Sequence, residues 1–155
     1  MKLKILVGTM TGTAEYVAQA IELDCADLVE RIDVLLMDQT GAQVFDEAAA
    51  VDTLYLICCS TYGAGDMPDN AQALYLALDD PPRFLGHVRY GVIALGDLGG
   101  HAATYCFGGL KFDARLADLG ARRIGAVWCH DASDGSVAET EAAAWCRQWL
   151  AVALA

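Results

Sequence analysis

The sequence is poor in basic residues. Its 155 residues include 10 lysines and arginines against 21 aspartates and glutamates, which gives a formal net charge of -11. Nucleic-acid binding depends largely on cations that neutralise phosphates, so this balance argues against nucleic acid as a partner. The acidic surface favours basic proteins as partners instead.

Long apolar runs are also absent. Hydrophobic residues make up 55% of the chain, but charged residues interrupt them repeatedly, so no segment is suited to crossing a membrane. The first apolar run, Leu3 to Val7, stops at Gly8 and is too short for the apolar region of a signal peptide. We therefore expect a soluble, cytoplasmic protein without a membrane partner.

The cysteines show no C-x-x-C pair and no Cys/His spacing typical of zinc ligands, so no metal site is expected. Most should be reduced and buried. Cys58 and Cys59 are adjacent, so their side chains should point to opposite faces of a strand and serve packing. The six cysteines are Cys25, Cys58, Cys59, Cys106, Cys129 and Cys146.

Short apolar runs bounded by turn residues alternate with amphipathic segments along the chain, which is the pattern of βαβ units. The length is that of one domain. We expect residues 1-155 to form a single α/β domain with a doubly wound, five-stranded parallel sheet in the order 2-1-3-4-5 and helices on both faces. The expected strands are Leu3 to Val7, Ile32 to Met37, Thr53 to Cys59, Tyr90 to Leu95 and Ile124 to Cys129.

Helical spacing of apolar residues predicts four helices. They cover Thr13 to about Asp24, Asp69 to Leu78, about Gly109 to Leu119 and Val137 to about Leu154. Asp69 is a candidate N-cap, and Trp145 and Trp149, one turn apart, are assigned to core packing. The segment Gln39 to Asp52 shows only a weak helical pattern, around Phe45 to Ala50.

In an open parallel sheet, ligands bind beyond the carboxyl ends of the strands. The first strand is followed by Gly8-Thr9-Met10-Thr11-Gly12-Thr13-Ala14-Glu15, which leads directly into a helix and so suits an anion. No triphosphate or dinucleotide fingerprint is present, and no Lys or Arg occurs from Ile5 to Glu30. This first loop therefore suits the terminal phosphate of a small cofactor, with threonines that merely cap the helix as the alternative.

Two later loops are also unusual. The second loop, Ser60-Thr61-Tyr62-Gly63-Ala64-Gly65-Asp66, follows the third strand and places Tyr62 either to stack on a planar ligand or to pack on the adjoining helix. The third loop, from Gly96 to Phe107 after the fourth strand, is long and rich in glycine. Long loops on rigid sheets tend to carry function.

These loops resemble those of the flavodoxin family, and specifically the FMN domains of diflavin reductases, such as the sulfite reductase flavoprotein, and their short stand-alone relatives. The matching stretches lie in order across nearly the whole chain. They are Thr9 to Glu15, Ser60 to Asp66 with Pro68 to Ala71, Leu95 to Asp97, and Lys111 to Leu116 leading to Leu119 to Ala121.

The resemblance implies a non-covalent FMN with its phosphate on the first loop and its ring between the second and third loops. Tyr62 would lie against one face of the ring, the Gly63 carbonyl would turn toward flavin N5 when that atom is protonated, and Asp131 would lie near the cofactor. It implies no catalytic residue. The implied cofactor-binding residues are Thr9, Met10, Thr11, Gly12, Thr13, Ala14, Ser60, Thr61, Tyr62, Gly63, Ala64, Gly65, Leu95, Gly96, Asp97, His101, Tyr105, Cys106, Phe107 and Asp131.

The sequence departs from the family pattern in the third loop, which is about two residues longer by this comparison. Relatives usually place an aromatic residue three positions after Asp97, where this chain has Gly100. Either His101 or Tyr105 takes over the second flavin face, or that face is more open to solvent. Met10 also stands where relatives often carry a polar residue.

Nine acidic residues and no Lys or Arg occur from Ile32 to Asp80, and two of the acids, Asp66 and Asp69, flank the second loop. Such a rim would steer a basic protein to the flavin. It would also disfavour an anionic reduced flavin, which predicts a low potential for the second reduction. A solvated acidic face that keeps the protein soluble is the alternative.

The leading hypothesis is a monomeric electron carrier that passes single electrons between a basic-surfaced flavin or iron-sulfur reductase and an acceptor redox enzyme. A small FMN-dependent NAD(P)H quinone or azo reductase is a second, which leaves open whether the chain is an enzyme. A binding module that has lost FMN is a third. A signalling receiver domain is disfavoured, because threonines stand where it needs clustered acids after the first strand.

Overall fold

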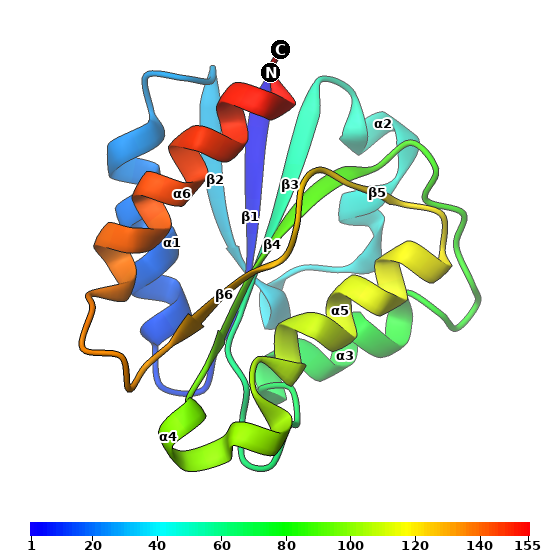
Figure 1. The fold of residues 1–155 in the computed structure, drawn as a ribbon. Coiled ribbons are helices and arrows are strands. Elements are labelled where there is room, and N and C mark those ends of the chain that lie inside the picture. Colours follow the sequence, from blue (N-terminus) through cyan, green and yellow to red (C-terminus); the bar gives the residue numbers. More distant parts are fainter.

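The computed structural model describes residues 1–155 as a three-layer arrangement of helix, sheet and helix (Figure 1). The sheet is parallel in every pair, with the order β2-β1-β3-β4-β5 and with β6 also paired to β4. This confirms the expected fold class and strand order. The strands are β1 (Lys2–Gly8), β2 (Arg31–Leu36), β3 (Thr53–Cys59), β4 (Arg89–Gly96), β5 (Arg122–Arg123) and β6 (Trp128–Asp131).

The last expected strand, Ile124 to Cys129, is wrong in its bounds, because the structure divides it. β5 pairs with the first two residues of β4, and β6 pairs with its last four. Between them, Gly125 has a φ of 74°, a left-handed conformation that extended backbone does not contain. The sheet therefore has six strands and not five. The segment predicted as the last strand still lies beside β4, as the predicted order requires.

The four predicted helices are present as α1 (Thr13–Cys25), α3 (Asp69–Ala77), α5 (Phe107–Asp118) and α6 (Ala138–Ala153). Asp69 is the first residue of α3 and Pro68 its N-cap, so Asp69 is not the cap. The segment Gln39 to Asp52, whose helical pattern is weak, forms only short helical turns. The third loop is also partly helical. These shorter elements are η1 (Met37–Gln39), η2 (Ala42–Phe45), α2 (Glu47–Ala50), α4 (Leu98–His101) and η3 (Ala102–Thr104).

Two cores lie on the two faces of the sheet. In Figure 1, α1 and α6 cover one face, while α3 and α5 cover the other. β3 is buried along its whole length, and its residues alternate between the cores. Cys58 belongs to the core under α1 and α6, and Cys59 belongs to the opposite one, which confirms that the two thiols face opposite ways.

The C-terminal tryptophans are part of the packing, as predicted. The rings of Trp145 and Trp149 stack with centroids 5.9 Å apart, and the Trp149 Nε1–H donates to the Ile124 carbonyl at 2.9 Å. Trp149 also packs on β4 so closely that a Cβ at Gly91 would lie 2.6 Å from its ring. The absence of a side chain at Gly91 is thus a packing requirement.

All six cysteines are free, and five of them are buried, whereas Cys129 is exposed. None of the helices combines the length and the apolar character that a membrane crossing demands.

Candidate functional site

The first loop turns from β1 into α1 through Gly12, which has a φ of 94°. The Thr9 Oγ1 accepts a hydrogen bond from the Gly12 N–H at 2.9 Å, and the Thr9 N–H donates to Asn70 Oδ1 at 2.8 Å. No side chain caps α1, so the alternative that the threonines merely cap this helix does not hold. The amides at the start of α1 are therefore left for another acceptor, which suits a phosphate.

The second loop is closed by two backbone hydrogen bonds between Tyr62 and Asp66, of 2.7 and 2.9 Å. Gly63 has a φ of 55°, and a Cβ there would meet nothing within 4 Å. Gly63 is thus in a conformation that favours glycine and has open space beside its Cα. Tyr62 is 49% exposed, which leaves ring surface free for a planar ligand.

The second loop is tied to the neighbouring strand and helix by Thr61. Its hydroxyl donates to the Leu95 carbonyl at 3.0 Å and accepts from the Gly108 N–H at 3.1 Å. A Cβ at Gly65 would come within 2.9 Å of Thr104, so the second loop also lies directly on the third. Through these contacts the second and third loops pack against each other.

The third loop is held by two carboxylates. Asp97 caps α4 by accepting from the Gly99 N–H at 3.0 Å. Asp131 Oδ1 accepts from the Leu98 N–H at 2.9 Å and from the backbone and hydroxyl of Ser133 at 2.9 and 2.7 Å. The hydrogen bonds from Ser133, and the weaker one from Leu98, lower the pKa of Asp131. Asp131 therefore positions the loop through its ionised carboxylate.

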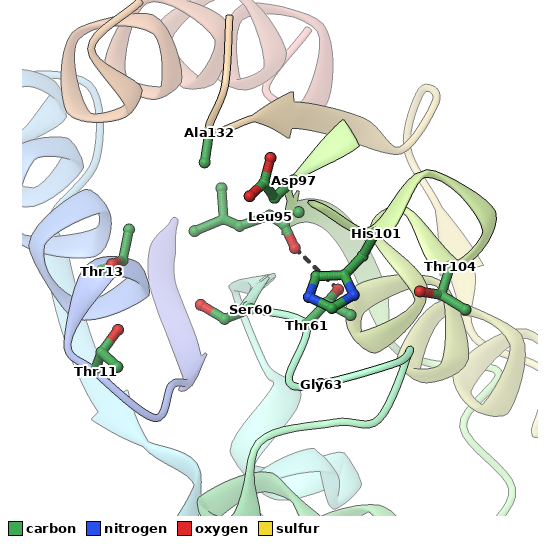
Figure 2. A pocket seen from close by; sticks show the side chains of 11 residues that line it. Thr11, Thr13, Ser60, Thr61, Gly63, Leu95, Asp97, His101, Thr104 and Ala132 are labelled. Atoms are coloured by element: carbon green, nitrogen blue, oxygen red, sulfur yellow. Dashed lines mark hydrogen bonds between the residues drawn. The ribbon is translucent and has the colours of Figure 1, made fainter. Parts of the chain in front are cut away.

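A depression lies at the carboxyl ends of β1, β3, β4 and β6, and Figure 2 shows its side chains converging from these strand ends and loops. Nine of its eleven lining residues were expected from the sequence, and five carry hydroxyl groups. Thr104 and Ala132 were missed; both directly adjoin predicted positions. The lining residues are Thr11, Thr13, Ser60, Thr61, Gly63, Leu95, Gly96, Asp97, His101, Thr104 and Ala132.

The other predicted residues surround the depression or lie beneath it. The side chains of Ala14 and Cys106 are fully buried, so they support the site from below. Tyr105 packs on Gly96, 2.9 Å from where a Cβ would be, whereas His101 is in the lining. The remaining predicted residues that do not line the depression are Thr9, Met10, Gly12, Tyr62, Ala64, Gly65, Phe107 and Asp131.

Met10 is half-exposed beside the first loop, where its sulfur accepts a hydrogen bond from the Asp69 N–H at 3.2 Å. The sulfur thus connects the first loop to the beginning of α3. A thioether is only a weak acceptor, so this contact is a weaker tie than the Thr9 to Asn70 bond beside it.

The charged residues on the strands and around the depression differ in sign. Six of the ten cationic side chains lie on the strands, all but Lys4 in their first two residues: Lys2, Lys4, Arg31, Arg89, Arg122 and Arg123. The carboxyl end carries Asp66, Asp69, Asp97 and Asp131 around the depression. The opening of the depression is therefore acidic.

The sequence and the fold are similar to those of known proteins. The Flavodoxin family model matches residues 5–145. Flavodoxin YqcA of Escherichia coli is 36% identical over 151 residues, covering 94% of this chain and 93% of that protein. The Vibrio parahaemolyticus sulfite reductase [NADPH] flavoprotein alpha-component is 38% identical over 122 residues, which are 77% of this chain but 18% of that protein. The solved structure of a cysteine-to-serine mutant of flavodoxin from Pseudomonas aeruginosa superposes with a TM-score of 0.79 at 31% identity, with full coverage of both chains. The chain belongs to the flavodoxin family of FMN-binding electron-transfer proteins.

Proposed function

We propose that this protein is an electron carrier that holds FMN non-covalently and passes single electrons between a reductase and an acceptor enzyme. The observation that carries the proposal is the hydroxyl-rich depression beside an uncapped helix N-terminus. No hydroxyl in its lining is hydrogen-bonded to His101 or Asp97, so the site lacks an activated nucleophile. Binding and positioning of a redox cofactor is the function that such a site supports.

The residues present fit FMN at both ends of the depression. The amides of the first loop, with the hydroxyls of Thr11 and Thr13 in the lining, would hold the phosphate without a basic side chain. Tyr62 would cover one face of the ring, and we assign the other face to His101 rather than to Tyr105. Bound FMN would supply reversible one-electron exchange.

Gly63 would respond to the protonation state of the flavin. Its peptide has no neighbour near the Cβ position and lies in the left-handed region. The Gly63 carbonyl can therefore turn to accept a hydrogen bond from a protonated flavin N5 without moving the Tyr62 to Asp66 bridge that closes the loop.

The acidic opening supports a partner with a basic surface. Asp66 and Asp69 are exposed beside the second loop, and unlike charges there would raise the rate of encounter at low salt. A flavin or iron-sulfur reductase and an acceptor enzyme are the partner classes we propose. The Vibrio relative is itself the flavoprotein component of an NADPH-dependent reductase.

We also propose that residues 1-155 act as one FMN-binding domain and as a monomer. Both faces of its single sheet are covered by its own helices. The six free cysteines support the cytoplasm, a reducing compartment, as its location.

The test compares FMN with riboflavin, which lacks the phosphate, by titrating the purified protein and following flavin fluorescence. FMN should bind at least about tenfold more tightly, as expected for a charge-assisted site, and Thr11→Val should reduce this preference. Thr140→Val, at an exposed position on α6, is the matched control. Equal affinities for the two flavins would refute the phosphate site.

Stepwise anaerobic reduction of the FMN-loaded protein tests the carrier itself. Two resolved one-electron steps are expected. A single two-electron step, together with rapid oxidation of NADPH by the purified protein alone, would instead identify a small NAD(P)H-dependent enzyme.

A further inference from the structure

Two cysteines distant in sequence are both neighbours of Ala94 on β4. Cys106 is the N-cap of α5, with a φ of 60°, and its Sγ donates to the Ala94 carbonyl at 3.2 Å. Ala94 is also the register partner of Cys129 on β6. The chain thus brings the end of the third loop and the last strand together through two thiols.

The two thiols differ in accessibility. Cys106 is fully buried, whereas Cys129 is exposed and is the one cysteine of the six that solvent reaches freely. Hydrogen bonding from Cys106 lowers the pKa of Cys129 to about 7, while burial raises the pKa of Cys59 to about 12. The thiolate is the reactive form of cysteine, so Cys129 combines reactivity with access.

We propose that Cys129 is a site of reversible oxidation by hydroperoxides and that Cys106 resolves the oxidised form to an intramolecular disulfide. In the first step the Cys129 thiolate attacks a peroxide oxygen, an S–O bond forms, and the O–O bond breaks. The sulfur loses two electrons to become a sulfenic acid, and the other peroxide oxygen takes a proton and leaves as an alcohol, or as water when the oxidant is hydrogen peroxide.

In the second step the Cys106 sulfur loses its proton and attacks the Cys129 sulfur. The S–S bond forms as the S–O bond breaks, and the departing hydroxide takes the proton to leave as water. The net reaction consumes two thiols and one hydroperoxide. It gives one disulfide, one alcohol and one water, and a dithiol reductant reverses it.

The disulfide would act on the third loop. Asp131 on β6 already holds the beginning of this loop through the Leu98 N–H, and a Cys106 to Cys129 bond would fix its end to the same strand. Oxidation would therefore clamp the segment from Asp97 to Cys106 at both ends. The modification itself needs no bound cofactor, so its test is independent of the proposed function.

A second thiol pair provides an internal control. Cys25 on α1 and Cys146 on α6 belong to the same core, and both are fully buried. A low-molecular-weight oxidant should leave this pair reduced while Cys129 reacts. If only Cys129 is oxidised, its exposure and reactivity determine the reaction, and the burial of two cysteines in one core is not sufficient for it.

The experiment treats the protein with an equivalent of hydrogen peroxide at pH 7.5, alkylates the remaining thiols and identifies peptides by mass spectrometry. The expected product is a monomer with a Cys106 to Cys129 disulfide and four alkylated cysteines, since six minus two leaves four. Cys129→Ser should prevent oxidation at Cys106. Cys106→Ser should stop the reaction at a sulfenic acid on Cys129 that dimedone traps, and Cys146→Ala should behave like the wild type.

Cys106 is buried, so Cys106→Ala serves as a second, apolar variant if the serine variant fails to fold. Three results would overturn the proposal. These are unchanged oxidation of Cys106 in Cys129→Ser, conversion of wild-type Cys129 to the sulfinic acid with Cys106 still alkylated, and a disulfide that forms only between two molecules on a non-reducing gel.

Discussion

Asp131 on β6 holds Leu98 on α4 by a hydrogen bond of 2.9 Å between its carboxylate and the backbone N–H. The same oxygen accepts from Ser133, so one carboxylate links the last strand to the beginning of the third loop. The family resemblance places Asp131 near FMN. In the structure its carboxylate is hydrogen-bonded to the third loop, which borders the depression.

Asp131→Ala should weaken FMN binding by about tenfold, because the loop loses a charge-assisted anchor. Isothermal titration with FMN measures the change. Asp134→Ala is the matched control. Asp134 accepts hydrogen bonds from the backbone N–H and the hydroxyl of Ser136 in the following turn and none from Leu98. Equal affinities of the two variants would show that Asp131 has no positioning role.

Alkylation of Cys129 should depend on pH in the neutral range. Its pKa is lowered to about 7, and only the thiolate reacts, so the rate should rise through pH 7 and level off above about pH 8. In Cys106→Ala the midpoint should move upward, toward the ordinary cysteine value of about 8.5. Labelling with iodoacetamide followed by mass spectrometry gives the rate at each pH, and an unchanged midpoint would contradict the assigned cause.

Asn70 connects the first loop to α3, because its Oδ1 accepts from the Thr9 N–H. Asn70→Ala leaves that amide without its partner and should lower the free energy of unfolding by about 1–3 kcal/mol. Asn70→Asp retains the acceptor for Thr9 but loses the Nδ2–H that donates to the Val7 carbonyl at 3.4 Å, so its stability should lie between those of Asn70→Ala and the wild type. Urea denaturation of the FMN-free variants tests both, and equal losses would indicate that the hydrogen bond is not the cause.

Gly91→Ala should destabilise the protein, since the new Cβ would lie 2.6 Å from the Trp149 ring. Overpacking of this kind costs about 1–3 kcal/mol, which corresponds to a fall in Tm of several degrees, at about 2–4 °C per kcal/mol for a domain of this size. Calorimetry measures the change. Combined with Trp149→Leu the loss should be less than additive, and full additivity would point away from this contact.

The acidic opening should accelerate electron transfer to a basic acceptor. Cytochrome c is a suitable probe because it is basic and accepts one electron. Asp66→Asn with Asp69→Asn should slow its reduction by the reduced FMN-loaded protein several-fold at low salt, and should flatten the salt dependence. Asp118→Asn, at the far end of α5, should have little effect on this rate. If Asp118→Asn slows the reaction as much as the double variant does, the net charge of the protein and not the position of Asp66 and Asp69 determines the rate.

The sequence pattern predicts those parts of the fold in which local periodicity and tertiary packing agree. β3 is an uninterrupted apolar run and is buried throughout, while α1 carries its buried Val17 and Ile21 at helical spacing. The loops of the site follow from the same source, because ligands of parallel sheets bind at the carboxyl ends of the strands. The rule points to the loops, and the family resemblance names nine of the eleven lining residues within and beside them.

The remaining features depend on contacts between distant segments. The break at Gly125 accompanies the hydrogen bond from Trp149 to Ile124, which no local pattern reports. α4 contains Gly99 and Gly100, poor helix formers, and exists where Asp97 caps it and Asp131 holds it. The meeting of Cys106 with Cys129 follows from strand register, which spacing along the chain does not reveal.

The division of the outer strand also affects how molecules of this protein meet one another. An unbroken edge strand offers a continuous row of amide and carbonyl groups to which a strand of another molecule can add. Here the edge beside β4 consists of pieces of two and four residues, and the first piece is a pair of exposed arginines. An added strand would find only short stretches of backbone. The interruption thus protects this side of the sheet from strand-by-strand aggregation.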